Sequence, residues 1–225
     1  MCGRYALATP AEELTEVFDV PPISFDYRPK YNIAPTQEAP VVASDSRGKR
    51  MGLLRWGLVP FWAKDVGIGN RMINARCETL LSKPAFKYAV ESRRCLVLAD
   101  GFYEWCAGAD GRVPHWIHLP DGGPMAFAGL WERWDGGEDE PLFTFTIVTT
   151  DASPSIERIH DRMPVILEED ARERWLDRDL PGESAAELLS PYEGELREHE
   201  VSRLVNSPAN DVPECRDPVE RPRVS

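Results

Sequence analysis

The residue whose functional groups are most reactive is the second residue of the chain, Cys2. Once Met1 is removed, as a small second residue permits, the mature chain begins with an α-amine and a thiol on one residue. Model peptides give the amine a pKa of about 8 and the thiol a pKa of about 8.5, so both are partly nucleophilic at neutral pH. Such a 1,2-aminothiol condenses with an aldehyde, and the thiol then closes a thiazolidine ring in an intramolecular step. The same pair suits an N-terminal nucleophile hydrolase, in which the amine acts as base.

Polar side chains stand at three further places where they interrupt apolar patterns. Glu104 lies inside an apolar, strand-like run, so it is either exposed at a sheet edge or buried with a raised pKa. His160 precedes Asp161 in a turn, an arrangement common in acid–base sites. Asn74 and Arg76 alternate with apolar residues, so a strand would place them on one face. Each pattern also occurs on ordinary solvated surfaces.

The net charge of −12 argues against a nucleic-acid partner, but the charge is unevenly distributed. Residues 47–94 hold eleven basic and three acidic side chains, a net charge of +8. This basic window mixes Trp56 and Trp62 with Lys64, which is typical of stacking on unpaired bases beside a phosphate groove. We expect Trp56 in the core, Trp62 partly exposed, and the surplus acidic residues facing away from any DNA. Scattered surface charge is the alternative interpretation.

Cysteine and histidine usage argues for reduced thiols and against a metal. The five cysteines, at positions 2, 77, 95, 106 and 215, include no C-x-x-C pair, and no secretory signal precedes them. A cytoplasmic protein is therefore expected. No histidine has zinc-ligand spacing, and His115 and His118 would face opposite sides of a strand, so neither a metal nor another cofactor is expected. No apolar run reaches the roughly 20 residues of a membrane span, so no membrane partner is expected.

Short apolar runs between Gly and Pro turns predict a β-rich fold. The clearest predicted strands cover residues 41–44, 53–59, 94–105, 115–119, 125–134 and 142–150. A first helix is expected after Pro10, with Thr9 as its cap and Glu12 completing a capping box. Further helices are expected over 168–176 and 184–189, an acidic hairpin loop over 136–140, and an irregular tail after about 215. The pattern predicts one α+β domain over residues 1–225, with a mixed or antiparallel sheet and a few flanking helices.

Several short motifs follow one another along the chain. They are MCGRY (1–5), YNIAPTQ (31–37), WGLVPFWA (56–63), INARCET (73–79), ADGFYEW (99–105), VTT (148–150), IHDRMP (159–164) and VN (205–206). Together they resemble the SOS response-associated peptidase (SRAP) family, also called abasic-site-processing proteins. The resemblance spans nearly the whole chain, from Cys2 to about Cys215, and it implies an SRAP-type fold.

The resemblance implies a protein that binds single-stranded DNA and cross-links to abasic sites, with Cys2 forming a thiazolidine with the ring-opened aldehyde. By resemblance, Asn74 holds the amine and the sugar oxygens, and Glu104 shuttles a proton. His160 acts as acid and base on the deoxyribose, including reversal of the cross-link. The residues implied in DNA binding are Arg4, Asn32, Pro35, Trp62, Lys64, Arg76, Thr149 and Arg162. Among them the arginines would grip phosphates, and Pro35 occupies the loop that unstacks bases.

Other functions remain open from the residues alone. Cys2 with His160 could form a cysteine peptidase or amidase, and the family name records a thiol autopeptidase that removes an N-terminal extension. A non-catalytic single-stranded DNA-binding module is a third possibility. An abasic-site lyase side reaction is compatible with the cross-linking function, because a Schiff base at C1′ invites β-elimination. We expect a monomer, cytoplasmic and associated with the nucleoid when bound to DNA.

Overall fold

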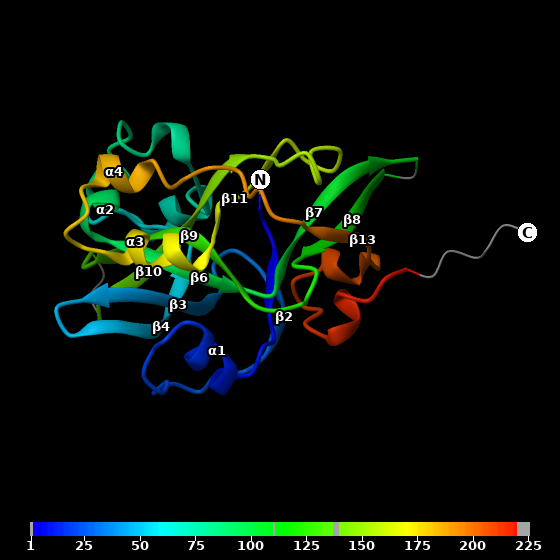
Figure 1. Cartoon of the computed structure of the whole chain (residues 1–225), viewed down its shortest axis with the longest axis horizontal. Coiled ribbons are helices and arrows are strands. Elements are labelled where there is room, and N and C mark those ends of the chain that lie inside the picture. The colour runs from blue at the N-terminus through cyan, green and yellow to red at the C-terminus, as the bar shows by residue number, and fades with distance from the viewer. Residues whose placement is uncertain (1, 110, 137–139, 220–225) are drawn as a thin grey trace, which may run out of the picture.

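The computed structural model describes residues 2–109, 111–136 and 140–219, and strands dominate its regular structure (Figure 1). The strands form two sheets, with short helices around them. The larger sheet contains both parallel and antiparallel pairs. The predicted α+β class with mixed sheets is therefore confirmed. Residues 137–139 of the predicted acidic loop lie outside the described part of the chain, as do residues 220–225 of the tail.

The larger sheet closes on itself. Its ring consists of β3 (Glu38–Asp45), β4 (Gly48–Trp56), β6 (Arg94–Ala99), β9 (Met125–Trp134) and β10 (Leu142–Asp151). Successive strands pair antiparallel from β4 through β3, β6 and β9 to β10, and the parallel pairing of β10 with β4 closes the ring. Closure satisfies the backbone groups that an open sheet would leave at its edges.

Three short strands extend this barrel and carry residues of the later site. β5 (Asn74–Arg76) runs parallel to β10, and β11 (Arg162–Pro164) runs antiparallel to the same strand. β12 (Ile166–Leu167) pairs with β9. The strand predicted from the alternation of Asn74 and Arg76 with apolar residues is confirmed, and the buried Ala75 lies between them.

The smaller sheet contains the N-terminal segment. It is antiparallel, and its order is β13 (Arg197–Glu200), β8 (Gly111–His118), β7 (Gly101–Gly108), β1 (Tyr5–Leu7) and β2 (Lys30–Ile33). The first strand of the chain is therefore an interior strand, with partners on both sides. Figure 1 shows this blue segment running between the barrel and the strands β7 and β8.

Aromatic packing joins the two sheets. Tyr5 of β1 is fully buried, and its ring lies 5.1 Å from the ring of Trp56 and 6.2 Å from that of Phe127, both on barrel strands. Trp56 stacks in turn on Phe145. The prediction that Trp56 belongs to the core is confirmed, and burial of large aromatic side chains is a leading source of folding free energy.

Asp100 redirects the chain from the barrel into the smaller sheet. The predicted strand over 94–105 is in fact two strands in different sheets, β6 and β7, and Asp100 lies between them. Its buried carboxylate accepts hydrogen bonds from the backbone N–H of Ala8 (2.8 Å) and the hydroxyl of Thr9 (2.7 Å). The next residue must be glycine, because a Cβ at Gly101 would lie 2.4 Å from the carbonyl oxygen of Ile117.

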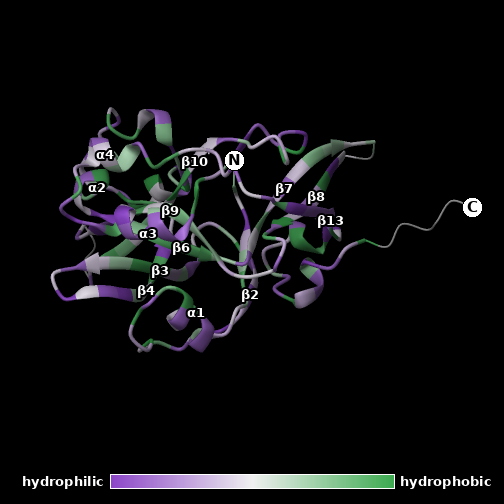
Figure 2. Ribbon diagram, in the orientation of Figure 1, coloured by the Kyte–Doolittle hydropathy of each residue, from purple (hydrophilic) through white to green (hydrophobic). Residues whose placement is uncertain are grey.

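The helices lie outside the barrel. They are α1 (Ala11–Val17), α2 (Lys87–Ser92), α3 (Glu169–Leu176) and α4 (Gly182–Ala186). The predicted cap of α1 is wrong, because Thr9 bonds Asp100 and no side chain caps the helix. α2 was not predicted, and the last helix is shorter than the predicted 184–189. Figure 2 shows hydrophilic residues along α3, whose Trp175 is buried against β6.

The C-terminal segment is more ordered than predicted. A 3₁₀ turn at Pro213–Cys215 is followed by Arg216, which donates to Asp100 at 2.9 Å. Pro218 then forms a bridge with Val201. The tail is thus attached to the fold through residue 218, because its arginine completes the hydrogen bonding of the buried Asp100 carboxylate.

We predict that Asp100→Ala lowers the free energy of unfolding by about 3 kcal/mol, because it leaves backbone donors and Arg216 without their buried partner. Denaturant unfolding of the purified protein measures this change. Asp26→Ala is the matched control, since Asp26 pairs with Arg28 at an exposed position and such pairs contribute little. Equal stability of the two variants would contradict the structural importance of Asp100.

Candidate active site

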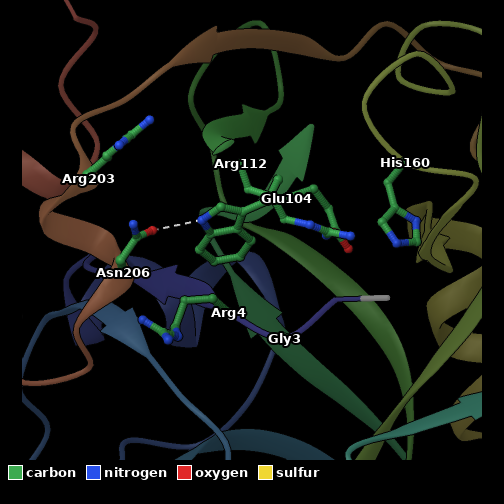
Figure 3. A pocket seen from close by; sticks show the side chains of 8 residues that line it. Gly3, Arg4, Glu104, Arg112, His160, Arg203 and Asn206 are labelled. Carbon is green, nitrogen blue, oxygen red and sulfur yellow. Dashed lines mark hydrogen bonds between the residues drawn. The ribbon is translucent and has the colours of Figure 1, made fainter. Parts of the chain in front are cut away.

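A pocket of about 630 Å³ opens beside the N-terminal segment (Figure 3). Its lining residues are Gly3, Arg4, Glu104, Trp105, Arg112, His160, Arg203 and Asn206. Glu104 and His160 lie at one end, and Arg203 and Asn206 lie at the other. The Trp105 indole N–H donates to the Asn206 side chain at 2.8 Å, which links β7 to the C-terminal segment across the pocket.

Cys2 lies directly before the pocket residue Gly3 and is fully buried. Its carbonyl oxygen accepts a hydrogen bond from Asn74 Nδ2 at 2.8 Å, and its Sγ lies 3.8 Å from the carbonyl oxygen of Arg4. Burial raises the pKa of the Cys2 thiol far above its ordinary value, and the Glu104 carboxylate raises that pKa further. Burial therefore favours the protonated form of this thiol more than the model-peptide value does.

Asn74 occupies the end of β5 that faces Cys2. Its Nδ2 atom holds the Cys2 carbonyl, while its Oδ1 atom is buried and has no hydrogen-bond partner among the described residues. A buried amide oxygen without a partner is costly, so this atom is suited to accept a hydrogen bond from an amine or a hydroxyl. The structure thus brings Asn74 and Cys2 together through the main chain.

Glu104 is a buried carboxyl on β7, with 3% of its surface exposed. Burial raises the pKa of Glu104 above its ordinary value, and the nearby His160 acts in the opposite direction. Of the two alternatives that the sequence left open for Glu104, edge exposure and burial, the structure shows burial. A carboxyl whose pKa is raised by burial is suited to donate and accept a proton, which general acid–base catalysis requires.

His160 is held by its neighbours in the turn before β11. Its Nδ1 accepts a hydrogen bond from the backbone N–H of Arg162 at 2.9 Å, and the Asp161 carboxylate lies 2.9 Å from the same nitrogen. The neutral ring can accept the hydrogen bond from Arg162 at Nδ1. The protonated ring can donate from the same nitrogen to the Asp161 carboxylate. Both protonation states of His160 therefore have a partner, which suits an acid–base residue.

Arg162 does not face the solvent as a phosphate ligand would. Its buried guanidinium donates to Glu78 at 2.5 Å, to Asp151 at 2.7 Å and to the carbonyl oxygen of Thr149 at 2.8 Å. These acceptors occupy the Arg162 guanidinium in this structure, and its implied contact with phosphate stays a prediction. Since the Arg162 backbone supports His160, the residue is better described as positioning the histidine.

Asn32 and Thr149 are also internal to the fold. Asn32 is buried, and its Nδ2 donates to the carbonyl oxygens of Val205, Ser207 and Asn210. Thr149 is fully buried on β10. Both side chains are buried in this structure, and their implied contacts with DNA stay predictions.

Arg4 combines a structural and a pocket role. It donates to Asn32 Oδ1 at 2.7 Å and to the Val205 carbonyl oxygen at 2.6 Å, and it lies 6.0 Å from the centre of the Trp105 ring. These contacts hold its guanidinium at the pocket wall. The N-terminal segment is thereby tied to the C-terminal segment.

The remaining DNA-binding candidates lie outside the residues that line the pocket. Trp62 is 46% exposed, as predicted, and Lys64 and Arg76 are exposed as well. Pro35 is half-buried in a turn. Arg76 follows Asn74 by two residues on β5 and so shares its face. Contacts of these four residues with DNA stay predictions.

Two basic residues of the 47–94 window are engaged within the fold, and none of the eleven lines the pocket. Lys49 pairs with Asp19 and Glu173, and the buried Arg94 donates to backbone carbonyls of the helical region, Trp175 among them. The pocket's arginines are instead Arg4, Arg112 and Arg203, all outside the window. The prediction that the window lines a DNA groove therefore does not hold for Lys49 and Arg94, and it stays a prediction for the other basic residues of the window. Arg203 shows that the acidic half of the chain also contributes positive charge to the pocket.

Sequence reasoning missed Arg112 and Arg203 as site residues. Trp105 and Asn206 stood within the quoted GFYEW and VN motifs, which were the available signal for them. Among residues 2–109, 111–136 and 140–219, no group of three or more His, Cys, Asp and Glu side chains is placed to hold a metal ion. No helix in the same part of the chain is both long and apolar enough to span a membrane.

The pocket and fold define a member of a known family. The family model described as SOS response associated peptidase (SRAP) matches residues 1–208, and the chain belongs to this family. A relative from Bacillus subtilis, named abasic site processing protein YoqW, is 42% identical over 219 residues, covering 95% of this chain and 98% of the relative. A relative from Gallus gallus, named abasic site processing protein HMCES, is 38% identical over 229 residues, covering 86% and 67%.

A solved structure agrees with this assignment. A crystal structure of a protein from Bacteroides thetaiotaomicron superposes with a TM-score of 0.86 at 25% identity, covering 97% of this chain and all of the other. The resemblance read from the sequence motifs is confirmed at the level of the family and the fold.

We predict that Glu104→Gln changes the pH dependence of stability. A carboxyl whose pKa is raised on folding binds more protons in the folded state, so its contribution to stability falls as the pH rises above the ordinary value of 4.5. The glutamine of Glu104→Gln does not titrate, so the variant does not lose stability in this way. Its free energy of unfolding relative to that of the wild type should therefore rise from acidic to neutral pH. Denaturant unfolding across that range measures the difference, and a constant difference would contradict the prediction.

Glu78→Gln is the control with the opposite sign. The hydrogen bond from Arg162 lowers the pKa of Glu78 to about 2. Its stabilising contribution is present above the ordinary pKa of 4.5 and is lost as the pH falls toward 2. This variant should therefore be less stable than the wild type at neutral pH and approach it in acid.

Proposed function

We propose that the mature protein binds single-stranded DNA and links covalently to abasic sites through Cys2. The observation that carries the proposal is the position of Cys2, bound by Asn74 and next to Glu104, at the edge of a pocket lined by His160 and three arginines. The family assignment and the printed names of the relatives support it. Removal of Met1 supplies the α-amine that the reaction needs.

The reaction begins at the amine. The Cys2 amine adds to the C1′ aldehyde of the ring-opened sugar, and loss of water leaves an iminium ion. Asn74 Oδ1, which is buried and has no partner among the described residues, accepts a hydrogen bond from the amine or from a sugar hydroxyl. Holding both reactants in place converts a bimolecular step into an intramolecular one.

Ring closure requires the thiol to lose its proton. Because burial keeps the Cys2 thiol protonated, a nearby base must take that proton as the C–S bond forms. Glu104 is close enough to alter the pKa of the thiol, and in its ionised form it is the base. That proton replaces the one consumed in forming the iminium ion, so the overall change is one condensation that releases one water molecule.

His160 acts on the sugar and in the reverse reaction. Its two alternative partners, the Arg162 N–H and the Asp161 carboxylate, support both a neutral and a charged ring. Proton donation to the ring sulfur as the C1′–S bond breaks returns the iminium ion, and water then hydrolyses that ion to the free amine and the aldehyde. The same Schiff base permits β-elimination, so we include abasic-site lyase activity as a secondary reaction. We also include autopeptidase activity toward residues that precede Cys2.

DNA is held by positive charge and by stacking. Arg4, Arg112 and Arg203 line the pocket and are placed to attract the phosphates that flank the lesion. The exposed ring of Trp62 offers a surface on which an unpaired base can stack. Lys64, Arg76 and Pro35 extend this proposed path of the strand.

We predict that the mature protein forms a heat-stable adduct with an abasic oligonucleotide and that Cys2→Ala abolishes it. Denaturing electrophoresis measures the adduct. Cys77→Ser is the control, because it removes a half-exposed thiol away from the proposed nucleophile and should leave the yield unchanged. A chain that retains residues ahead of Cys2 keeps the thiol but blocks the amine, and it should also fail. An undiminished yield from Cys2→Ala would sink the proposal.

We predict separate kinetic effects at the two acid–base residues. Glu104→Gln should slow adduct formation by about 10²-fold, since a positioned general base contributes 10²–10⁴-fold. His160→Gln should chiefly slow release of the adduct. Time courses of formation, and of release after an excess of unmodified competitor protein is added, measure both rates. Identical release by wild type and His160→Gln would remove the assigned role of the histidine.

A further inference from the structure

A second thiol, imidazole and carboxylate are joined on the smaller sheet, and the proposed reaction does not use them. Cys106 Sγ lies 3.2 Å from His115 Nε2, and His115 Nδ1 lies 2.6 Å from Glu198 Oε2. The three residues come from the neighbouring strands β7, β8 and β13. A nucleophile bonded to a base that a third group orients is the arrangement found in activated thiols.

The Glu198 carboxylate determines which ring nitrogen of His115 carries the proton. Although burial raises it, the pKa of Glu198 is held below its ordinary value by hydrogen bonds from His115 and Arg158. An ionised Glu198 accepts a hydrogen bond and therefore favours the His115 tautomer with its proton on Nδ1. Nε2 is then the acceptor that faces the Cys106 thiol. The geometry allows His115 to take the thiol proton.

The other cysteines differ from Cys106. Cys2, Cys95 and Cys215 are buried. Cys77 is half-exposed like Cys106, but burial raises the pKa of its thiol, and it lies beside Glu78. Cys77 is therefore an internal reference that is also partly exposed but has no imidazole partner among its described contacts.

We propose that Cys106 is a second nucleophilic site and that its substrates are small conjugated carbonyl compounds. His115 takes the proton from Sγ, and the thiolate adds to the β-carbon, forming a C–S bond while the C=C π electrons move to the α-carbon. The His115 imidazolium then returns its proton to that carbon. The product is a thioether, and the atoms and electrons balance without an oxidant or a reductant.

The choice of this class rests on the proposed function. β-Elimination at a Schiff base of an abasic site leaves an α,β-unsaturated aldehyde on the released 3′ end. Cys106 follows Glu104 by two residues on β7, so the two side chains share a face about 7 Å apart along the strand. Arg158, which binds Glu198, precedes His160 by two residues. The second thiol thus lies beside the place where such an aldehyde would form.

Alkylation of the native protein by acrylamide tests the site without DNA. Peptide mass spectrometry follows each cysteine, and Cys106 should react about tenfold faster than Cys77. His115→Gln and Glu198→Gln should reduce the Cys106 rate to that of Cys77, whereas Glu198→Asp should keep most of the enhancement. An unchanged Cys77 rate shows that each variant is folded. Equal rates at Cys106 and Cys77 in the wild type would overturn the proposal.

A second experiment distinguishes the source of the aldehyde. Cys2→Ala protein is incubated either with an oligonucleotide bearing a 3′ unsaturated aldehyde or with crotonaldehyde, and the products are fixed with borohydride. Modification of Cys106 by both identifies DNA ends as substrates, and modification by crotonaldehyde alone identifies free aldehydes. Modification by neither refutes the site. Cys106→Ser should still form the Cys2 adduct with abasic DNA, so the two proposals fail independently.

Discussion

The hydrogen bond from Asn74 to the Cys2 carbonyl is the contact on which the site depends. It joins a barrel element, β5, to the residue that enters the smaller sheet, and so it sets where the start of the chain lies relative to β10 and β11. The flanking packing of Tyr5 against Trp56 prevents this segment from shifting. A terminus of most proteins is frayed, whereas here it is held as firmly as a core strand.

The two sheets contribute different parts of the chemistry. The smaller sheet supplies Glu104 and the barrel side supplies Asn74 and His160, so the pocket exists only where the two meet. Arg4 strengthens this junction by bonding both Asn32 and the Val205 carbonyl. Burial at the junction also explains why the Cys2 thiol and the Glu104 carboxyl both have raised pKa values. In the proposed reaction, proton transfer between them would be a local event, shielded from bulk water.

Local patterns predicted most of the strands, because alternation of apolar residues is a property of a few neighbouring positions. β9 was predicted with its observed bounds, and the apolar neighbours of Glu104 left burial as one of two alternatives, the one that the structure shows. The break between two strands at Asp100 was not predicted, because its hydrogen-bond partners Ala8 and Thr9 lie about ninety positions away in the sequence. Thr9 is a second case of a distant partner. Its hydroxyl was expected to cap α1, but it donates a hydrogen bond to the Asp100 carboxylate instead.

Side-chain type alone could not separate residues that line the pocket from residues that hold the fold. Asn32 and Arg162 carry the polar groups expected of DNA ligands, yet carbonyls and carboxylates of the protein itself satisfy them. Arg112 and Arg203 stand apart in the sequence, and only the pairing of β7 with β8 and the return of the C-terminal segment bring them to one pocket. Charge near the reaction therefore depends on topology more than on composition.

The interior position of β1 has a consequence for how the protein is made. One of the two strands that flank β1 is β7, which begins at Gly101. During synthesis on the ribosome the first residues therefore lack that partner until the chain has grown past this point. Enzymes that trim or modify a nascent terminus act within this interval, before the sheet closes over Cys2. Slowing or speeding elongation through the first hundred codons would thus alter the fraction of molecules that leave the ribosome with an unblocked terminal amine.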